Sequence, residues 1–239
     1  GASQTATFTG AQLTAETIIL NESSTGTSGL IINVGSGETT TFTNITAGTF
    51  TSGTDTVTIN GTTGNETITG PNIASAISGG AGNDAISGGT EADILSGGAG
   101  NDNLTGGDGT DSLTGGAGND TYNFNTGDVD TGETIVEASS GGTDTISVIT
   151  STDFVNMSNA SLNEIEVINF AGASQTATFT GAQLTAETIT LNETVTGTSC
   201  IPIGMSSHTI VQSPSILCPW RGISKLQSYD VEFSKLTAT

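Results

Sequence analysis

The chain has 239 residues, and its 24 acidic residues face only three basic ones, which gives a formal net charge of −21. This charge excludes nucleic acid and anionic membrane surfaces as partners, because both are bound through lysine and arginine. No run of about 18 apolar residues occurs, so we expect no membrane-spanning helix. A start methionine and a basic segment ahead of an apolar one are also missing, so we expect no N-terminal signal peptide and interpret the chain as a fragment.

The charged residues are distributed unevenly along the chain. Two acids, Asp230 and Glu232, lie beyond residue 199, which leaves 22 acids and no base in residues 1–199. That part of the chain repels itself unless a cation condenses on it. The residues beyond 199 hold every base, the only histidine, the only tryptophan and both cysteines: Arg221, Lys225, Lys235, His208, Trp220, Cys200 and Cys218.

Residues 1–28 recur almost unchanged as residues 172–199, at an offset of 171 residues. Only three of the 28 positions differ: Ile19/Thr190, Ser23/Thr194 and Ser24/Val195. Near-identity over this distance indicates a duplicated module within a larger array.

Residues 29–60 hold short runs of threonine and β-branched residues, GLIINV, TTTFTNI and DTVTIN, punctuated by glycine and asparagine. Alternation and β-branching predict strands rather than helices, and we expect no convincing helix in the chain. The segment SLNEIEVINF (161–170) is ambiguous, because its apolar residues fit a helical face and nearly fit a strand.

Residues 61–123 follow a nine-residue period. Five segments from residue 79 carry glycine at positions one and two, aspartate at six and an apolar residue at eight: GGAGNDAIS, GGTEADILS, GGAGNDNLT, GGDGTDSLT and GGAGNDTYN. Two weaker segments from residue 61 keep the frame. The position-eight residues form one apolar column, as the core of a solenoid requires. They are Ile68, Ile77, Ile86, Leu95, Leu104, Leu113 and Tyr122.

This nonapeptide resembles the RTX family, the hemolysin-type calcium-binding repeats of secreted bacterial proteins. The resemblance is strong over residues 61–123 and looser over 124–170. It implies an all-β fold, a parallel β-roll in which two nonapeptides form each 18-residue coil. The hexamer GGAGND starts at residues 79, 97 and 115, always 18 apart, and supports this coil length independently. One edge of the roll is therefore regular and the other is degraded.

Stacked coils are expected to bring equivalent acids about 4.8 Å apart. Calcium, which takes six to eight oxygen ligands, would turn the repulsion between them into attraction and couple folding to metal binding. One edge is predicted to stack Glu66, Asp84, Asp102 and Asp120, and the other Ser75, Asp93 and Asp111. We expect about three well-formed Ca²⁺ sites, at the pairs Asp84/Asp102, Asp102/Asp120 and Asp93/Asp111.

The resemblance adds backbone carbonyls of the regular edge to the ligands: Gly79, Ala81, Gly97, Ala99, Gly115 and Ala117. A first-coil site at Glu66 or Ser75 is predicted to be weaker. Glu91 stands where the family has glycine, and a non-glycine residue rarely takes a positive φ, so a weaker site is also expected at Asp93.

Four acids after the repeats allow two interpretations: they are solvated loop residues, or they form a capping site that helps to end the roll. These acids are Asp128, Asp130, Glu133 and Asp144.

The tail departs from the module, which would continue GLIINV after Ser199. One interpretation is a frameshift, an assembly join or vector sequence. The other is a genuine C-terminal end that serves as a signal for a type I exporter. Cys200 and Cys218 could pair or remain free thiols.

We predict five segments: a Thr-rich β segment (1–60), the calcium-binding roll (61–124), a capping β segment (125–171), a second module copy (172–199) and the off-pattern tail (200–239). No HExxH or GxSxG signature occurs, so no enzymatic activity is expected.

The main hypothesis for the function is a calcium-folded module of a secreted or cell-surface, adhesin-like protein of a Gram-negative-type bacterium, with an extracellular surface or matrix as partner. The alternative is the C-terminal export domain of an RTX protease, lipase or hemolysin. Ice binding through threonine-rich faces is a third hypothesis, disfavoured because threonine recurs only irregularly at position nine.

Overall fold

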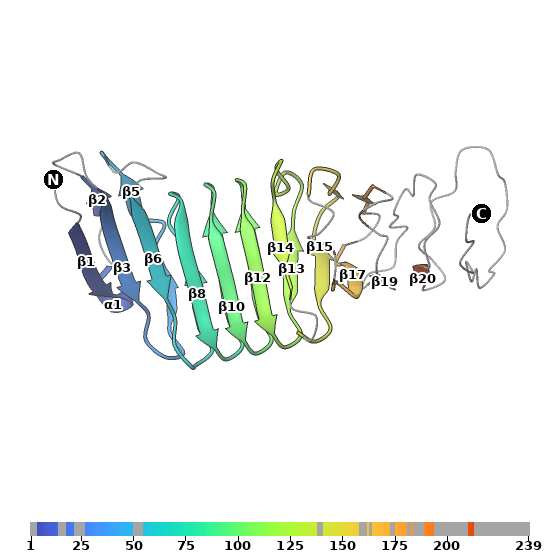
Figure 1. The fold of residues 1–239 in the computed structure, drawn as a ribbon, viewed down its shortest axis with the longest axis horizontal. Helices are drawn as coiled ribbons and strands as arrows, with labels where there is room; N and C mark the ends of the chain where they lie inside the picture. The colour runs from blue at the N-terminus through green and yellow to red at the C-terminus, as the bar shows by residue number, and fades with distance from the viewer. Residues whose placement is uncertain are drawn as a thin grey trace.

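The fold is a parallel β-solenoid, seen here in a computed structural model in which successive coils lie side by side along the long axis (Figure 1). This architecture confirms the predicted all-β class and parallel β-roll. The structure describes residues 4–13, 18–21, 27–49, 55–137, 141–157, 162, 164–172, 175–180, 183, 189–193 and 210–212.

Two parallel sheets face each other across the core. Within the described residues, the first sheet has seven strands: β1 (Gln4–Thr9), β3 (Ser28–Asn33), β6 (Thr56–Asn60), β8 (Ser75–Ala81), β10 (Ile94–Ala99), β12 (Ser112–Ala117) and β14 (Thr134–Val136). The second has nine: β4 (Thr39–Thr41), β7 (Thr67–Thr69), β9 (Ala85–Gly89), β11 (Asn103–Gly107), β13 (Thr121–Phe124), β15 (Thr145–Val148), β17 (Val167–Phe170), β19 (Ile189–Glu193) and β20 (Ile210–Gln212). Two small parallel pairs join β2 (Ile18–Leu20) to β5 (Ile45–Ala47) and β16 (Thr152–Asp153) to β18 (Ala177–Thr178).

The position-eight residues form the core of the roll. They stack in register, Ile77 on Leu95 on Leu113 in one sheet and Ile86 on Leu104 in the other. All seven predicted members of the column are at most 2 % exposed. Successive side chains of a strand point to opposite faces, so their neighbours in sequence face outward. Truncating one such leucine to alanine is expected to cost about 2–5 kcal/mol.

The coils are short in the repeats and longer beyond them. Hydrogen bonds between equivalent residues of neighbouring coils span 18 residues from Glu66 to Asp120, which confirms the predicted coil. Past β12 the spacing grows, and Asp120 contacts Asp144, 24 residues on. The added residues lie between strands, so the apolar register is kept and Tyr122 pairs with Ile146.

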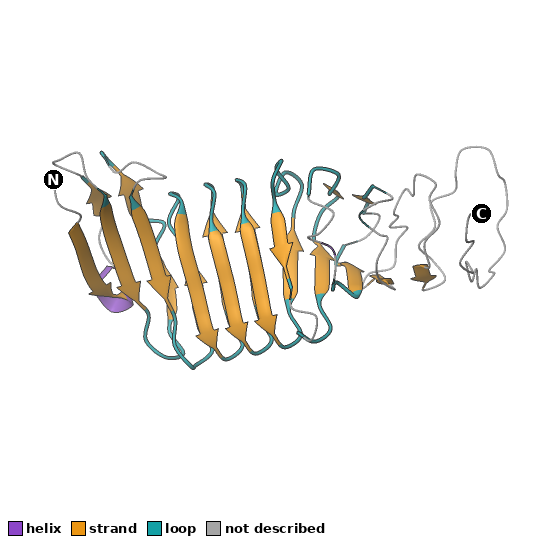
Figure 2. Cartoon of the chain, viewed as in Figure 1, coloured by secondary structure: helices purple, strands orange, loops and turns teal. Residues whose placement is uncertain are grey.

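The structure shows the secondary structure of the segments for which the sequence pattern is weak or ambiguous. The runs of residues 29–60 form β3 to β6, and 167–170 of the ambiguous segment form strand β17. The single α-helix among the described residues is α1 (Gly10–Leu13), one turn that the sequence did not predict (Figure 2). No described helix has the length and hydropathy that crossing a membrane requires.

The two module copies share local contacts but differ in strand pairing. In both, a threonine donates to a glutamine side chain three residues later, Thr9 to Gln12 and Thr180 to Gln183. In the first copy β1 pairs with β3, whereas in the second β18 pairs with β16. Pairing therefore depends on the neighbouring coils. Cys200 and Cys218 lie outside the described residues.

Candidate metal site

The turns between the two sheets place acidic side chains in two columns, one along each edge of the roll. Nearly all of these side chains are inaccessible to solvent. The regular column, on turns leading from the seven-stranded to the nine-stranded sheet, is Glu66, Asp84, Asp102, Asp120 and Asp144. The irregular column, on the opposite turns, is Asp93, Asp111 and Glu133, and Ser75, the first residue of β8, stands ahead of Asp93.

A hydrogen-bond ladder holds each column together. The backbone N–H of one member donates to a carboxylate oxygen of the next, as Asp84 N does to Asp102 Oδ1 at 2.8 Å. The irregular column repeats the contact, from Asp93 N to Asp111 Oδ1 at 2.8 Å. Three further contacts extend the ladders past the repeats: Asp120 N to Asp144 Oδ1 (2.8 Å), Asp144 N to Glu166 Oε2 (2.7 Å) and Asp111 N to Glu133 Oε2 (2.9 Å).

The second oxygen of each repeat aspartate has no partner among the described residues. These buried atoms are Oδ2 of Asp84, Asp93, Asp102, Asp111 and Asp120. Burying a polar atom without a hydrogen bond costs about 1–3 kcal/mol, and more for a charged group. Residues 1–199 contain no lysine, arginine or histidine that could pair with these atoms. The donor set therefore fits a hard cation that prefers carboxylate oxygen.

The two leading glycines of a repeat make room for this arrangement. A Cβ on Gly97 would collide with the Asp102 carboxylate of the same repeat. Gly98 takes φ +115°, which side chains rarely adopt, and a Cβ there would collide with the carbonyl of Gly80 in the preceding coil. The glycine pair is thus part of the carboxylate pocket.

Electrostatics make the columns costly without a cation. Carboxylates one strand spacing apart repel by about 1 kcal/mol in water and about 3 kcal/mol at an effective dielectric of 20. Burial raises the pKa of Asp102 to about 6 and of Asp111 to about 6, with nearby acids adding to both rises. It raises the pKa of Asp93 to about 7 and of Glu133 to about 8, so the irregular column is the more strongly shifted.

Glu66 differs from the aspartates that follow it in the regular column, because both of its carboxylate oxygens accept hydrogen bonds. Its Oε1 accepts the N–H of Gly37 at 2.7 Å, and its Oε2 accepts the N–H of Thr62 at 2.9 Å. Burial raises its pKa, but hydrogen bonds, including one from Gly64, outweigh burial and leave the pKa lowered. Both oxygens are engaged, so Glu66 caps the column with little need of a metal.

A second ladder, which the nine-residue pattern does not predict, runs along the regular edge and is confined to it among the described residues. The N–H of each position-five asparagine donates to Oδ1 of the preceding asparagine at 2.8 Å, from Asn83 to Asn65, Asn101 to Asn83 and Asn119 to Asn101. Position five of the irregular edge holds Ala92 and Thr110 instead. The asparagine of GGAGND therefore joins coils as well as forming a turn.

The strain expected at Glu91 is absent. The matching Gly100 and Gly109 take φ +128° and +127°, whereas Glu91 is not among the described residues with positive φ. Asp93 nevertheless keeps its burial and its ladder contacts, including bonds from the Ser75 N–H and hydroxyl. Weaker metal binding at Asp93 stays a prediction.

The acids after the repeats divide between the two interpretations. Glu133 and Asp144 are at most 1 % exposed and belong to the columns, so the solvated interpretation is wrong for both. Asp128 is buried and accepts from Asn125, and Asp130 is exposed. The sequence does not point to Glu137 or Glu166, because the nine-residue pattern ends before them.

The predicted backbone ligands lie on the regular edge, in β8, β10 and β12. The carbonyls of Ala99 and Ala117 accept the N–H of Gly82 and Gly100 at 2.7 Å. A carbonyl oxygen has a second lone pair, so a carbonyl that accepts one N–H can also bind a cation.

Two stacked acid columns on a parallel β-roll define a calcium-binding repeat solenoid. The family described as the RTX calcium-binding nonapeptide repeat (4 copies) matches residues 60–95, 76–104 and 87–122. The chain therefore carries RTX repeats, and Ca²⁺ is the ion that such repeats bind. No curated protein and no solved structure matches the chain.

Proposed function

We propose that the chain is a calcium-folded, non-catalytic module of a secreted or cell-surface repeat protein with an adhesin-like, structural role. The observation that carries the proposal is the set of five buried Oδ2 atoms in register, with no basic residue in the first 199 positions. The near-identical module copies support a repetitive structural protein over the export domain of an enzyme.

Calcium ions would be held between successive aspartates of each column, at Asp84/Asp102, Asp102/Asp120 and Asp93/Asp111. A bound Ca²⁺ supplies positive charge and accepts oxygen donors. The chain supplies the rest: glycine pairs that leave room for the carboxylates, an N–H ladder that fixes their first oxygens, and an apolar column that joins the coils. Because the ligands converge only in the coiled state, binding energy becomes folding energy.

Circular dichroism and calorimetry of the full chain test the proposal. In chelator we expect the loss of β-structure in the repeats, and in millimolar calcium its return together with calcium uptake. Magnesium at the same concentration is the control, because it demands a tighter octahedral geometry. Spectra that do not change with calcium would refute calcium-coupled folding. A catalytic domain in the same polypeptide would favour the export-domain alternative.

A further inference from the structure

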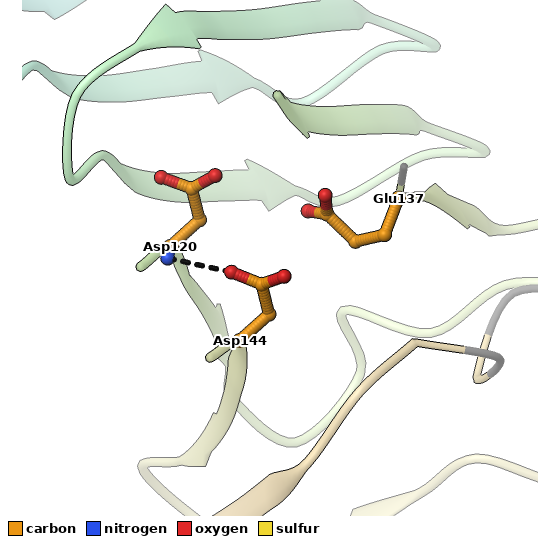
Figure 3. Close-up of side chains that lie close together, drawn as sticks. All are labelled: Asp120, Glu137 and Asp144. Atoms are coloured by element: carbon orange, nitrogen blue, oxygen red, sulfur yellow. Dashed lines mark hydrogen bonds between the residues drawn. The ribbon is translucent and has the colours of Figure 1, made fainter. Parts of the chain in front are cut away.

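A third carboxylate joins the end of the regular column. Oxygens of Asp120, Glu137 and Asp144 lie within 4.8 Å of one another (Figure 3). Asp120 and Asp144 are successive column members, joined by the bond from Asp120 N to Asp144 Oδ1. Glu137 follows β14, outside the nonapeptides and outside the residues that the family matches.

Asp120 points a buried oxygen into this cluster. The side chain is 1 % exposed, and its Oδ2 accepts no hydrogen bond among the described residues. A Cβ on Gly115 would collide with three groups at once, Asp120 Oδ2, Glu137 Oε1 and the Tyr122 hydroxyl. The three groups therefore converge on a point that the glycine leaves open.

Glu137 takes a place that the inner coils give to a backbone carbonyl. In strand register Thr114 pairs with Val136, so Glu137 aligns with Gly115, the first residue of a repeat. In the inner coils, the atoms nearest to a Cβ on Gly79 are the Asp84 carboxylate and the carbonyl of Gly97 in the next coil. At Gly115 they are the Asp120 carboxylate, the Glu137 carboxylate and the Tyr122 hydroxyl, which also accepts the Gly115 N–H at 2.6 Å.

We infer that Asp120, Glu137 and Asp144 form a terminal cation site that closes the regular column, with calcium as the ion of matching size. The inference rests on the proposed function of the repeats. Oxygens bound to one Ca²⁺ at about 2.3–2.6 Å lie at most about 5 Å apart, so the three oxygens can share an ion where they stand. Magnesium, at about 2.0–2.1 Å, would need the oxygens to move closer together.

The test counts calcium bound per chain by competitive titration against a chromophoric chelator, on the full chain. Glu137→Gln removes one charge and is expected to bind one calcium fewer than the wild type. The control is Asp153→Asn, which removes an exposed charge in the same region and should leave the number unchanged. Circular dichroism in calcium checks that the roll still forms in both variants.

The outcomes separate this inference from the proposed function. A wild type that binds calcium together with a Glu137→Gln variant that binds the same number with the same affinity would overturn the terminal site alone. A wild type that binds no calcium would overturn both. Should Glu137→Gln fail to form the roll, Glu137→Asp keeps the charge on a shorter stem and is expected to weaken one site at least tenfold while the others hold.

Discussion

The two edges of the roll carry the same aspartate ladder on different supports. On the regular edge an asparagine ladder runs beside it, and glycine occupies position four of the three repeats that start at residues 79, 97 and 115. On the irregular edge the asparagines are missing and Glu91 replaces one glycine, while burial and neighbouring acids shift the carboxylates further. Along the regular edge, the coils are thus joined partly by hydrogen bonds of uncharged asparagines. Along the irregular edge, the joining of the coils depends more on neutralising the charges of the carboxylates.

The largest expected difference between the edges lies at position four. Gly100→Ala puts a side chain at φ +128° and against the carbonyl of Gly82, so we expect a loss of roughly 3 kcal/mol or more in unfolding free energy. Glu91→Ala, at the matching position of the irregular edge, should change it by less than about 0.5 kcal/mol. Denaturation in saturating calcium measures both. Equal losses of unfolding free energy would mean that the backbone at position four does not differ between the two edges.

Neutralising one carboxylate on each edge comes next. Asp102→Asn and Asp111→Asn keep an oxygen for the N–H ladder but remove the charge. Because Asp102 belongs to two predicted pairs and Asp111 to one, we expect the calcium midpoint to rise at least tenfold for Asp102→Asn and less for Asp111→Asn. Calcium titration followed by circular dichroism gives the midpoints. A larger shift for Asp111→Asn would reverse the ranking of the edges.

The variants Asp102→Asn and Asp111→Asn are also expected to differ in how their calcium affinity depends on pH. The pKa values of Asp93 and Glu133, about 7 and about 8, lie above those of an unfolded chain, so the calcium-free fold binds extra protons and gains stability as pH falls from about 8 to 4. Calcium must displace these protons, so its apparent affinity falls over the same range.

Between pH 8 and 6 we expect about a tenfold loss of affinity at a site governed by a pKa of about 7, and about a twofold loss for a pKa of about 6. Asp102→Asn, which leaves the irregular edge intact, should therefore show a steeper pH dependence than Asp111→Asn. Calorimetry at the two pH values measures it. Parallel pH profiles would show that the shifted groups do not bind calcium.

The smallest expected effect is that of a single asparagine. Asn101→Ala removes the acceptor of the Asn119 N–H and should cost about 1 kcal/mol. Thr110→Ala, at position five of the irregular edge, should stay within about 0.5 kcal/mol. Chemical denaturation of both variants in calcium provides the comparison. If Asn101→Ala leaves the stability unchanged, the asparagine ladder does not stabilise the regular edge, and there is no reason to rank that edge as the more firmly joined.

The sequence predicts the roll well wherever its period is strict. Leu95 and Asp102 are placed correctly because an 18-residue coil fixes both the core column and the acid column. The positions of Glu133 and Glu137 could not be predicted fully, because the coils lengthen past β12. The nine-residue period then no longer indicates which residues of neighbouring coils are in contact.

Contacts between distant segments were also beyond the pattern. The carboxylate of Glu66 is bound by the N–H of Gly37, 29 residues earlier, from a region without a clear repeat. A motif shows which residue type stands at a position, but it does not show whether other parts of the chain already supply that residue's hydrogen bonds.

The most direct measurement is the anomalous scattering of calcium in crystals of the full chain grown with calcium. The account predicts difference peaks between Asp84 and Asp102, between Asp102 and Asp120, and between Asp93 and Asp111, each within coordination distance of an Oδ2 atom. A chain that binds calcium in solution but shows no peaks between stacked aspartates would contradict it.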